Sequence, residues 1–143
     1  MHLMRSLSLS LCALSVAAIA RAQSTLRVHD VDSLSWMPAA VPGLELAVVD
    51  GNPQGPGPYT VAMRYKAGIT TPLHTHPADM SLVVIRGQFF VGAGSGDKPL
   101  GAGSVVLIPK GVKHAEGAIT DAVVLLSGQG PMTIEMVGGP PGH

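Results

Sequence analysis

The chain has 143 residues, with nine basic and nine acidic side chains and a formal net charge of zero. This length suits one domain. Because the chain has no basic patch for nucleic acid or an anionic membrane, we expect a small molecule, an ion or another protein as its partner.

The first 22 residues are interpreted as a signal peptide. Arg5 gives a positive start, residues 7–20 form an apolar run, and Ala20-Arg21-Ala22 is a small-x-small cleavage pattern. The run is shorter than the roughly 20 apolar residues of a transmembrane helix, and Leu11 before Cys12 argues against a lipid anchor. We therefore expect an exported protein, periplasmic or secreted, with no membrane segment in its mature form.

The mature part, residues 23–143, is predicted to be one all-β domain. Short runs rich in Val, Leu and Ile alternate with clusters of Gly and Pro. The strands recur about every ten residues, which predicts a sandwich or closed barrel. The tail, residues 138–143, is expected to be disordered. The predicted strands are Leu44–Asp50, Tyr59–Tyr65, Met80–Arg86, Gln88–Ala93, Ser104–Ile108, Lys113–Ile119, Ala122–Ser127 and Met132–Val137.

The strand predicted over Met80–Arg86 has two largely apolar faces. Side chains alternate along a strand, so every second residue from Met80 onwards shares one face and the residues between them share the other. We expect both faces to be covered. The outer cover is either the N-terminal segment around Leu34, Trp36 and Met37 or a second subunit, so a homodimer is one of two interpretations.

Two histidines are candidates for metal ligands. His74 and His76 lie two positions apart, so on an extended chain both imidazoles point to the same side. Neutral imidazole binds zinc, copper, iron and nickel. Taken alone, the pair would be interpreted as two solvent-exposed loop histidines.

Two longer segments connect this pair with a third histidine. They are Gly68-x5-His74-x-His76-x3-Met80-x6-Gly87 and Gly103-x5-Pro109-x-Gly111-x2-His114. Together they resemble the two motifs of the cupin superfamily. The resemblance implies a double-stranded β-helix, the cupin or jelly-roll barrel, and it implies that His74, His76 and His114 bind one metal ion.

The chain departs from the cupin pattern at two positions. Ala118 replaces the trailing asparagine of the second motif, and the other departure is at Met80. Met80 stands where the resemblance implies a glutamate, and the neighbouring Asp79 would point to the opposite face of the strand. Three interpretations stay open: Met80 fills space beside a three-histidine site, its thioether is a fourth ligand that favours copper, or the barrel holds no metal. The expected metal is copper, iron, manganese, nickel or zinc.

Glu116 is the candidate catalytic residue. It follows His114 by two positions, so on a regular strand its carboxylate points inward with the imidazole. There it would orient a ligand or accept a proton from a bound substrate. A twist of the strand near Gly117 would instead turn the carboxylate to water.

Two classes of function follow. Three protein ligands leave open positions on a metal, which a catalytic site requires. One interpretation is therefore an exported mononuclear metal-binding cupin that acts on a small molecule as a dioxygenase-type oxidoreductase. The alternative is a non-catalytic periplasmic protein that binds copper or a small ligand.

Overall fold

The structure is a computed structural model that describes residues 25–92 and 98–138. The predicted signal peptide, residues 1–22, lies outside these residues, as does the predicted tail beyond residue 138, so both stay predictions. Within the described part of the chain, no helix is long and apolar enough to cross a membrane.

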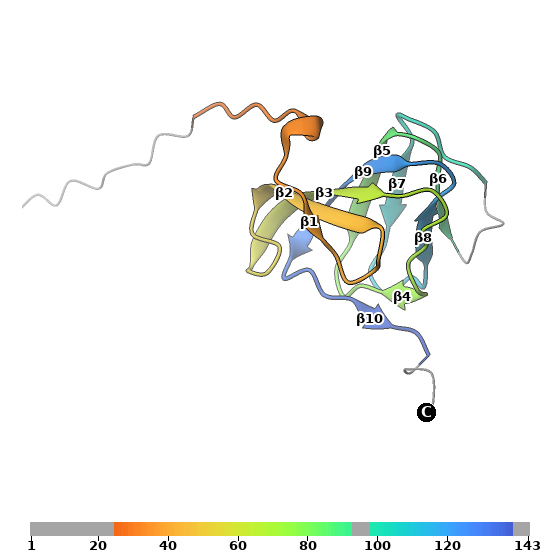
Figure 1. Ribbon diagram of the computed structural model, residues 1–143. Coiled ribbons are helices and arrows are strands. Elements are labelled where there is room, and N and C mark those ends of the chain that lie inside the picture. Colours follow the sequence, from red (N-terminus) through yellow and green to blue (C-terminus); the bar gives the residue numbers. More distant parts are fainter. Residues whose placement is uncertain (1–24, 93–97, 139–143) are drawn as a thin grey trace, which may run out of the picture.

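The described residues form an all-β fold, which confirms the predicted fold class. One short 3-10 helix, η1, precedes the strands (Figure 1). The elements are η1 (Val31–Ser33), β1 (Met37–Pro38), β2 (Leu44–Gly51), β3 (Gly57–Tyr65), β4 (His74–Thr75), β5 (Met80–Arg86), β6 (Phe89–Gly92), β7 (Val105–Ile108), β8 (Ala115–Ala118), β9 (Ala122–Gly130) and β10 (Glu135–Met136).

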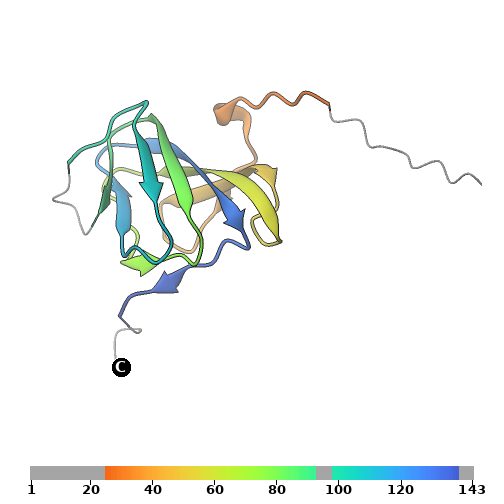
Figure 2. The same ribbon diagram turned by 180° about the vertical axis from the view of Figure 1, so that it is seen from behind.

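The strands wrap around a common interior, as Figures 1 and 2 show from opposite sides. A six-stranded sheet in the order β1-β2-β3-β9-β5-β7 forms one wall. The pairs β10-β4 and β6-β8 form the other wall, and isolated bridges from Thr70 to Gly117 and from His74 to His114 join these two pairs. This second wall therefore carries all three candidate histidines.

An aliphatic and aromatic core fills the space between the walls. Leu82 and Val84 of β5 are buried, as is Val124 of the neighbouring β9. The ring of Tyr65 meets that of Phe89 edge to face, with 5.0 Å between their centroids. The predicted alternation of the Met80–Arg86 strand is confirmed, because every second residue from Met80 to Val84 is buried. The apolar packing between the two walls holds the histidine wall in place.

The N-terminal segment covers part of the outer face of the six-stranded sheet. Leu34 lines the same hollow as Ile85 of β5. The guanidinium of Arg64 lies 4.5 Å from the centre of the Trp36 ring. The first of the two predicted covers is thus present over this part of the sheet, whereas the homodimer stays a prediction.

Several predicted strand limits were wrong, most clearly around the histidines. The predicted strand Lys113–Ile119 is only Ala115–Ala118, and Met132–Val137 is only Glu135–Met136. The two-residue strand β4 was not predicted. It exists because its backbone pairs with residues about 40 and 60 positions away, His114 and β10, and local sequence patterns do not carry such long-range pairing.

Candidate metal centre

Three histidines converge on the inner side of the second wall. His74 lies in β4, His76 follows it, and His114 directly precedes β8. The backbones of His74 and His114 exchange two hydrogen bonds of 2.9 and 3.0 Å, which holds the two side chains next to each other. All three are buried, and one ring nitrogen from each lies within 4.8 Å of the other two. The structure thus brings together the three histidines that the sequence singled out.

Backbone carbonyls fix which ring nitrogen faces the centre of the cluster. The Nδ1 atoms of His74, His76 and His114 lie 2.7, 2.7 and 2.9 Å from the carbonyl oxygens of Pro72, Thr133 and Val112. A carbonyl only accepts hydrogen bonds, so each Nδ1 carries the proton and donates. In the neutral rings, each Nε2 therefore has a free lone pair, the arrangement seen in metal-binding histidines.

Glu116 also points into the cluster. Its Oε2 lies 3.7 Å from Nε2 of His74 and 3.6 Å from Nε2 of His114. The residue is only 8% exposed, so the interpretation that a strand twist turns it to water was wrong. The hydroxyl of Tyr65 donates a hydrogen bond of 3.2 Å to Oε1, while Oε2 is buried without a hydrogen-bond partner among the described residues.

Burial sets the protonation of two side chains at this centre. Desolvation lowers the pKa of His76, and the nearby rings of His74 and His114 lower it further, although the hydrogen bond to Thr133 acts in the opposite direction. Burial also raises the pKa of Tyr65 well above its usual value, with the Glu116 carboxylate adding to the effect. His76 therefore favours the neutral form that binds metals, and Tyr65 keeps the proton that it donates.

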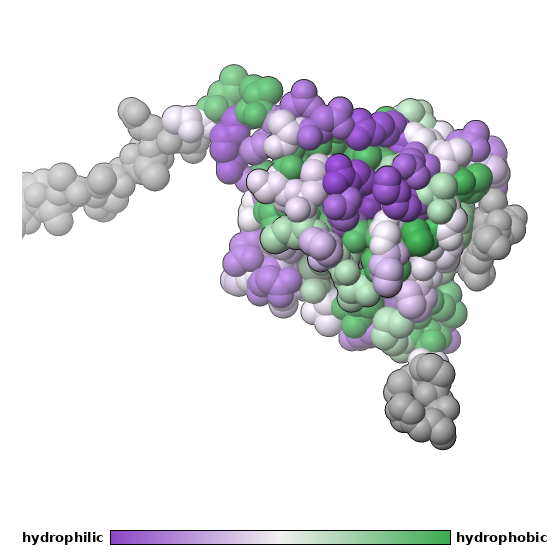
Figure 3. Space-filling model, viewed as in Figure 1, coloured by the Kyte–Doolittle hydropathy of each residue, from purple (hydrophilic) through white to green (hydrophobic). Residues whose placement is uncertain are grey.

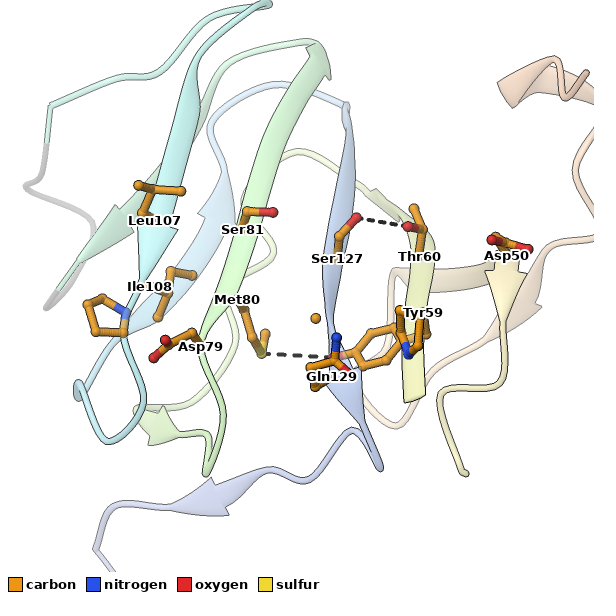
Figure 4. A pocket seen from close by; sticks show the side chains of 13 residues that line it. Asp50, Tyr59, Thr60, Asp79, Met80, Ser81, Leu107, Ile108, Ser127 and Gln129 are labelled. Carbon is orange, nitrogen blue, oxygen red and sulfur yellow. Dashed lines mark hydrogen bonds between the residues drawn. The ribbon is translucent and has the colours of Figure 1, made fainter. Parts of the chain in front are cut away.

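Met80 is the first residue of β5 and is buried on the inner face of this strand. Its sulfur lies 3.9 Å from the hydroxyl of Tyr59, a contact that Figure 4 marks with a dashed line. Both residues line a groove that differs from the cavity at the histidines. Asp79 lies outside the cluster, because its exposed carboxylate accepts a hydrogen bond of 2.8 Å from the backbone of Lys110.

A largely apolar cavity of about 470 Å³ opens beside the cluster. The C-terminal segment forms one side of this cavity, because β10 pairs with β4 and carries the chain past the histidines (Figure 1). At the lower end of the molecule, where Figure 1 places β10, the surface in Figure 3 is mostly hydrophobic. The residues that line the cavity include His74, His76, Glu116, Tyr65, Met63, Leu126, Met132, Ile134 and Met136.

A comparison with models of protein families shows to which family this chain belongs. The model of the ChrR cupin-like domain matches residues 24–133. The chain belongs to the ChrR cupin-like family. Among curated proteins, nothing matches the chain significantly.

Solved cupin structures share the fold at low sequence identity. The polyketide cyclase RemF from Streptomyces resistomycificus has a TM-score of 0.66 and 18% identity, over 80% of this chain and 87% of that one. KdgF from Halomonas sp. has a TM-score of 0.59 and 22% identity, over 70% and 91%. Salicylate 1,2-dioxygenase from Pseudoaminobacter salicylatoxidans has a TM-score of 0.60 and 19% identity, over 70% and 30%.

The sequence missed two kinds of contributor to the centre. Tyr65 lies on β3, far from either motif, and Thr133 contributes only its backbone carbonyl. A carbonyl leaves no mark in the residue types. The signal for Tyr65 was its inward position on a predicted strand, which would have placed its hydroxyl inside the barrel.

Proposed function

We propose that this cupin is an exported mononuclear metal-binding protein that acts on a small, largely apolar molecule as a dioxygenase-type oxidoreductase. The observation that carries the metal site is the convergence of three buried imidazoles whose Nδ1 atoms all donate to carbonyls. The free lone pairs on the three Nε2 atoms are donors of intermediate softness, which suit transition metals.

The shape of the cavity supports a small organic ligand. His74 and His76 line the cavity of about 470 Å³, whose other walls are largely apolar. Pockets of this size hold small molecules, with apolar walls for affinity and few polar groups for orientation. When bound, a transition metal would supply Lewis-acid or redox chemistry at the inner end of this cavity.

Different residues of the chain would hold the metal and position the organic ligand. The three histidines would hold the metal, while Met63, Leu126 and the C-terminal segment would exclude water and position the ligand. The dioxygenase class is supported by the similar fold of salicylate 1,2-dioxygenase. That likeness concerns the fold, and the same fold also occurs in a polyketide cyclase, so the reaction must be tested directly.

A non-catalytic copper-binding protein is the second candidate. Three methionines, Met63, Met132 and Met136, line the same cavity as His74 and His76. Thioethers together with imidazoles favour copper, especially Cu(I), over harder metals. The predicted signal peptide supports this candidate as well, because copper carriers of this kind would act outside the cytosol.

Oxygen uptake separates the two candidates. The apoprotein is loaded in turn with Fe(II), Mn(II), Ni(II), Cu(II) or Zn(II), and dioxygen consumption is followed with a panel of phenols and hydroxybenzoates. The oxidoreductase proposal predicts uptake that needs both a metal and an organic substrate and that disappears in His114→Gln. One bound metal with no uptake on any substrate would favour the non-catalytic candidate. Cell fractionation of the full-length protein tests export.

A further inference from the structure

We propose that Glu116 is the fourth protein ligand of the metal. A carboxylate two residues after His114 would then replace the glutamate that is missing after His76. This rests on the metal binding proposed above and adds the make-up of the ligand set. With four protein ligands, the metal would keep a position open for substrate by expanding to five or six ligands. Met80 occupies the usual glutamate position, and Glu116 enters the same cluster from β8, which begins directly after the bridge between His74 and His114.

Donor spacing supports direct coordination. Metal–nitrogen and metal–oxygen bonds of about 2.0–2.1 Å in a tetrahedral site place neighbouring donor atoms about 3.3 Å apart. Oε2 of Glu116 lies 3.7 Å from Nε2 of His74 and 3.6 Å from Nε2 of His114. These separations are within a few tenths of an ångström of the tetrahedral value, so Oε2 reaches the cluster without rearrangement of the strand.

The electrostatics of the cluster favour a cation. The Nε2 atoms present lone pairs toward the centre because every Nδ1 donates to a carbonyl. Oε2 of Glu116 adds a further lone-pair donor, is buried, and has no hydrogen-bond partner among the described residues. Buried acceptors without a donor are costly and rare. A metal ion held by the three histidines and met by Oε2, which lies beside His74 and His114, would satisfy these acceptors.

A hydrogen bond from Tyr65 fixes the orientation of the Glu116 carboxylate. The Tyr65 hydroxyl donates to Oε1 at 3.2 Å, which leaves Oε2 as the oxygen that faces the histidines. The Glu116 backbone is held on both sides, since its N–H donates to the hydroxyl of Thr71 and its carbonyl accepts from the Thr71 N–H, at 3.0 and 2.8 Å. Such partners of a ligating carboxylate fix its orientation and raise metal affinity.

The close approach of β8 to its neighbours depends on Gly117. A Cβ at this position would lie 2.7 Å from the carbonyl oxygen of Ile69 and 2.8 Å from the ring of Phe90. Only glycine therefore lets β8 pack this closely against Ile69 and Phe90. The residue next to Glu116 is thus the one that allows its carboxylate to reach the cluster.

The test is Co(II) binding to the full chain, followed by competition with a chromophoric chelator and by the visible spectrum of the bound ion. Glu116→Gln removes the charged oxygen and is expected to lower Co(II) affinity by more than the roughly 10–100-fold that loss of an outer hydrogen-bond partner costs. It is also expected to shift the visible bands, because one donor changes. Glu45→Gln is the matched control: this half-buried carboxylate of β2 accepts a hydrogen bond of 2.7 Å from Arg64 and does not line the cavity at the histidines, so affinity and spectrum should stay as in the wild type.

The outcomes separate this inference from the proposed metal binding. If the wild type binds no Co(II), the proposed function fails. If it binds one Co(II) but Glu116→Gln retains both the affinity and the spectrum, the metal site stands and the role of Glu116 is overturned. Should Glu116→Gln fold poorly, Glu116→Asp replaces it. The shorter side chain keeps the charge but withdraws the oxygen, so the same losses are expected, and wild-type behaviour would again overturn the inference.

Discussion

Removing the Tyr65 hydroxyl tests the architecture around Glu116 in the apoprotein. Tyr65→Phe keeps the ring, whose edge-to-face contact with Phe89 has a centroid distance of 5.0 Å. The change deletes the hydroxyl that donates to Oε1 of Glu116 and that also lies 3.9 Å from the sulfur of Met63. Since Oε2 already has no partner among the described residues, the carboxyl group would lose its remaining side-chain hydrogen bond while it stays buried.

The expected cost follows from that lost partner. A net intramolecular hydrogen bond contributes about 0.5–1.5 kcal/mol, and leaving a buried acceptor unsatisfied costs about 1–3 kcal/mol. We therefore expect Tyr65→Phe to lower the free energy of unfolding of the apoprotein by about 1–3 kcal/mol. In the metal-loaded protein, the same change should lower metal affinity by about 10–100-fold, because Tyr65 orients the ligating carboxylate.

Urea unfolding of the apoprotein measures the stability effect. The midpoint should fall while the slope with denaturant stays constant, since the surface exposed on unfolding hardly changes. A double-mutant cycle with Glu116→Gln should give a coupling energy within the range of about 0.5–3 kcal/mol found for residues in contact. An unchanged midpoint together with strictly additive effects would refute the reasoning, because Tyr65 and Glu116 would then not stabilise each other.

Further predictions concern the backbone, the core, Met80 and the metal. Gly87 and Gly103 both have φ +84°, but a Cβ would lie 2.3 Å from the carbonyl oxygen of Asp121 at the first and in open space at the second. In thermal unfolding, Gly103→Ala should therefore cost about 1–2 kcal/mol and Gly87→Ala about 1–3 kcal/mol more; equal losses would contradict this. Leu82→Ala, at a fully buried core position, should cost about 2–5 kcal/mol in urea unfolding. Met80→Leu should leave Zn(II) affinity unchanged in calorimetry, and a selective loss of Cu(I) affinity would instead identify its sulfur as a ligand. Adding metal at about 100 times its dissociation constant should raise stability by about 2.7 kcal/mol, and a chelator should reverse this.

The parts of the fold that were predictable from the sequence are those with local or periodic signals. Alternation predicted the inward face of β5, and the i, i+2 spacing of His74 and His76 predicted their shared direction. The same spacing from His114 gave an inward Glu116 as one of two interpretations, and the structure shows this side chain buried. These inferences succeed because side-chain direction on a strand depends only on the local backbone.

The contacts that complete the centre could not be predicted in the same way. The carbonyl of Thr133 reaches His76 only because the C-terminal segment returns to β4. Tyr65 meets Glu116 across the barrel, 51 positions away. Both depend on tertiary packing between segments distant in sequence, and a single sequence carries no direct signal of such pairing.

The most direct test of the central claim is the metal content of the purified protein, measured by native mass spectrometry after saturation with Zn(II) and removal of free metal. The account predicts one ion per chain in the wild type and no retained ion in a variant with His74, His76 and His114 all changed to Gln. A wild-type protein that retains no metal, or a triple variant that retains one ion as tightly, would contradict the claim that these histidines form a metal centre.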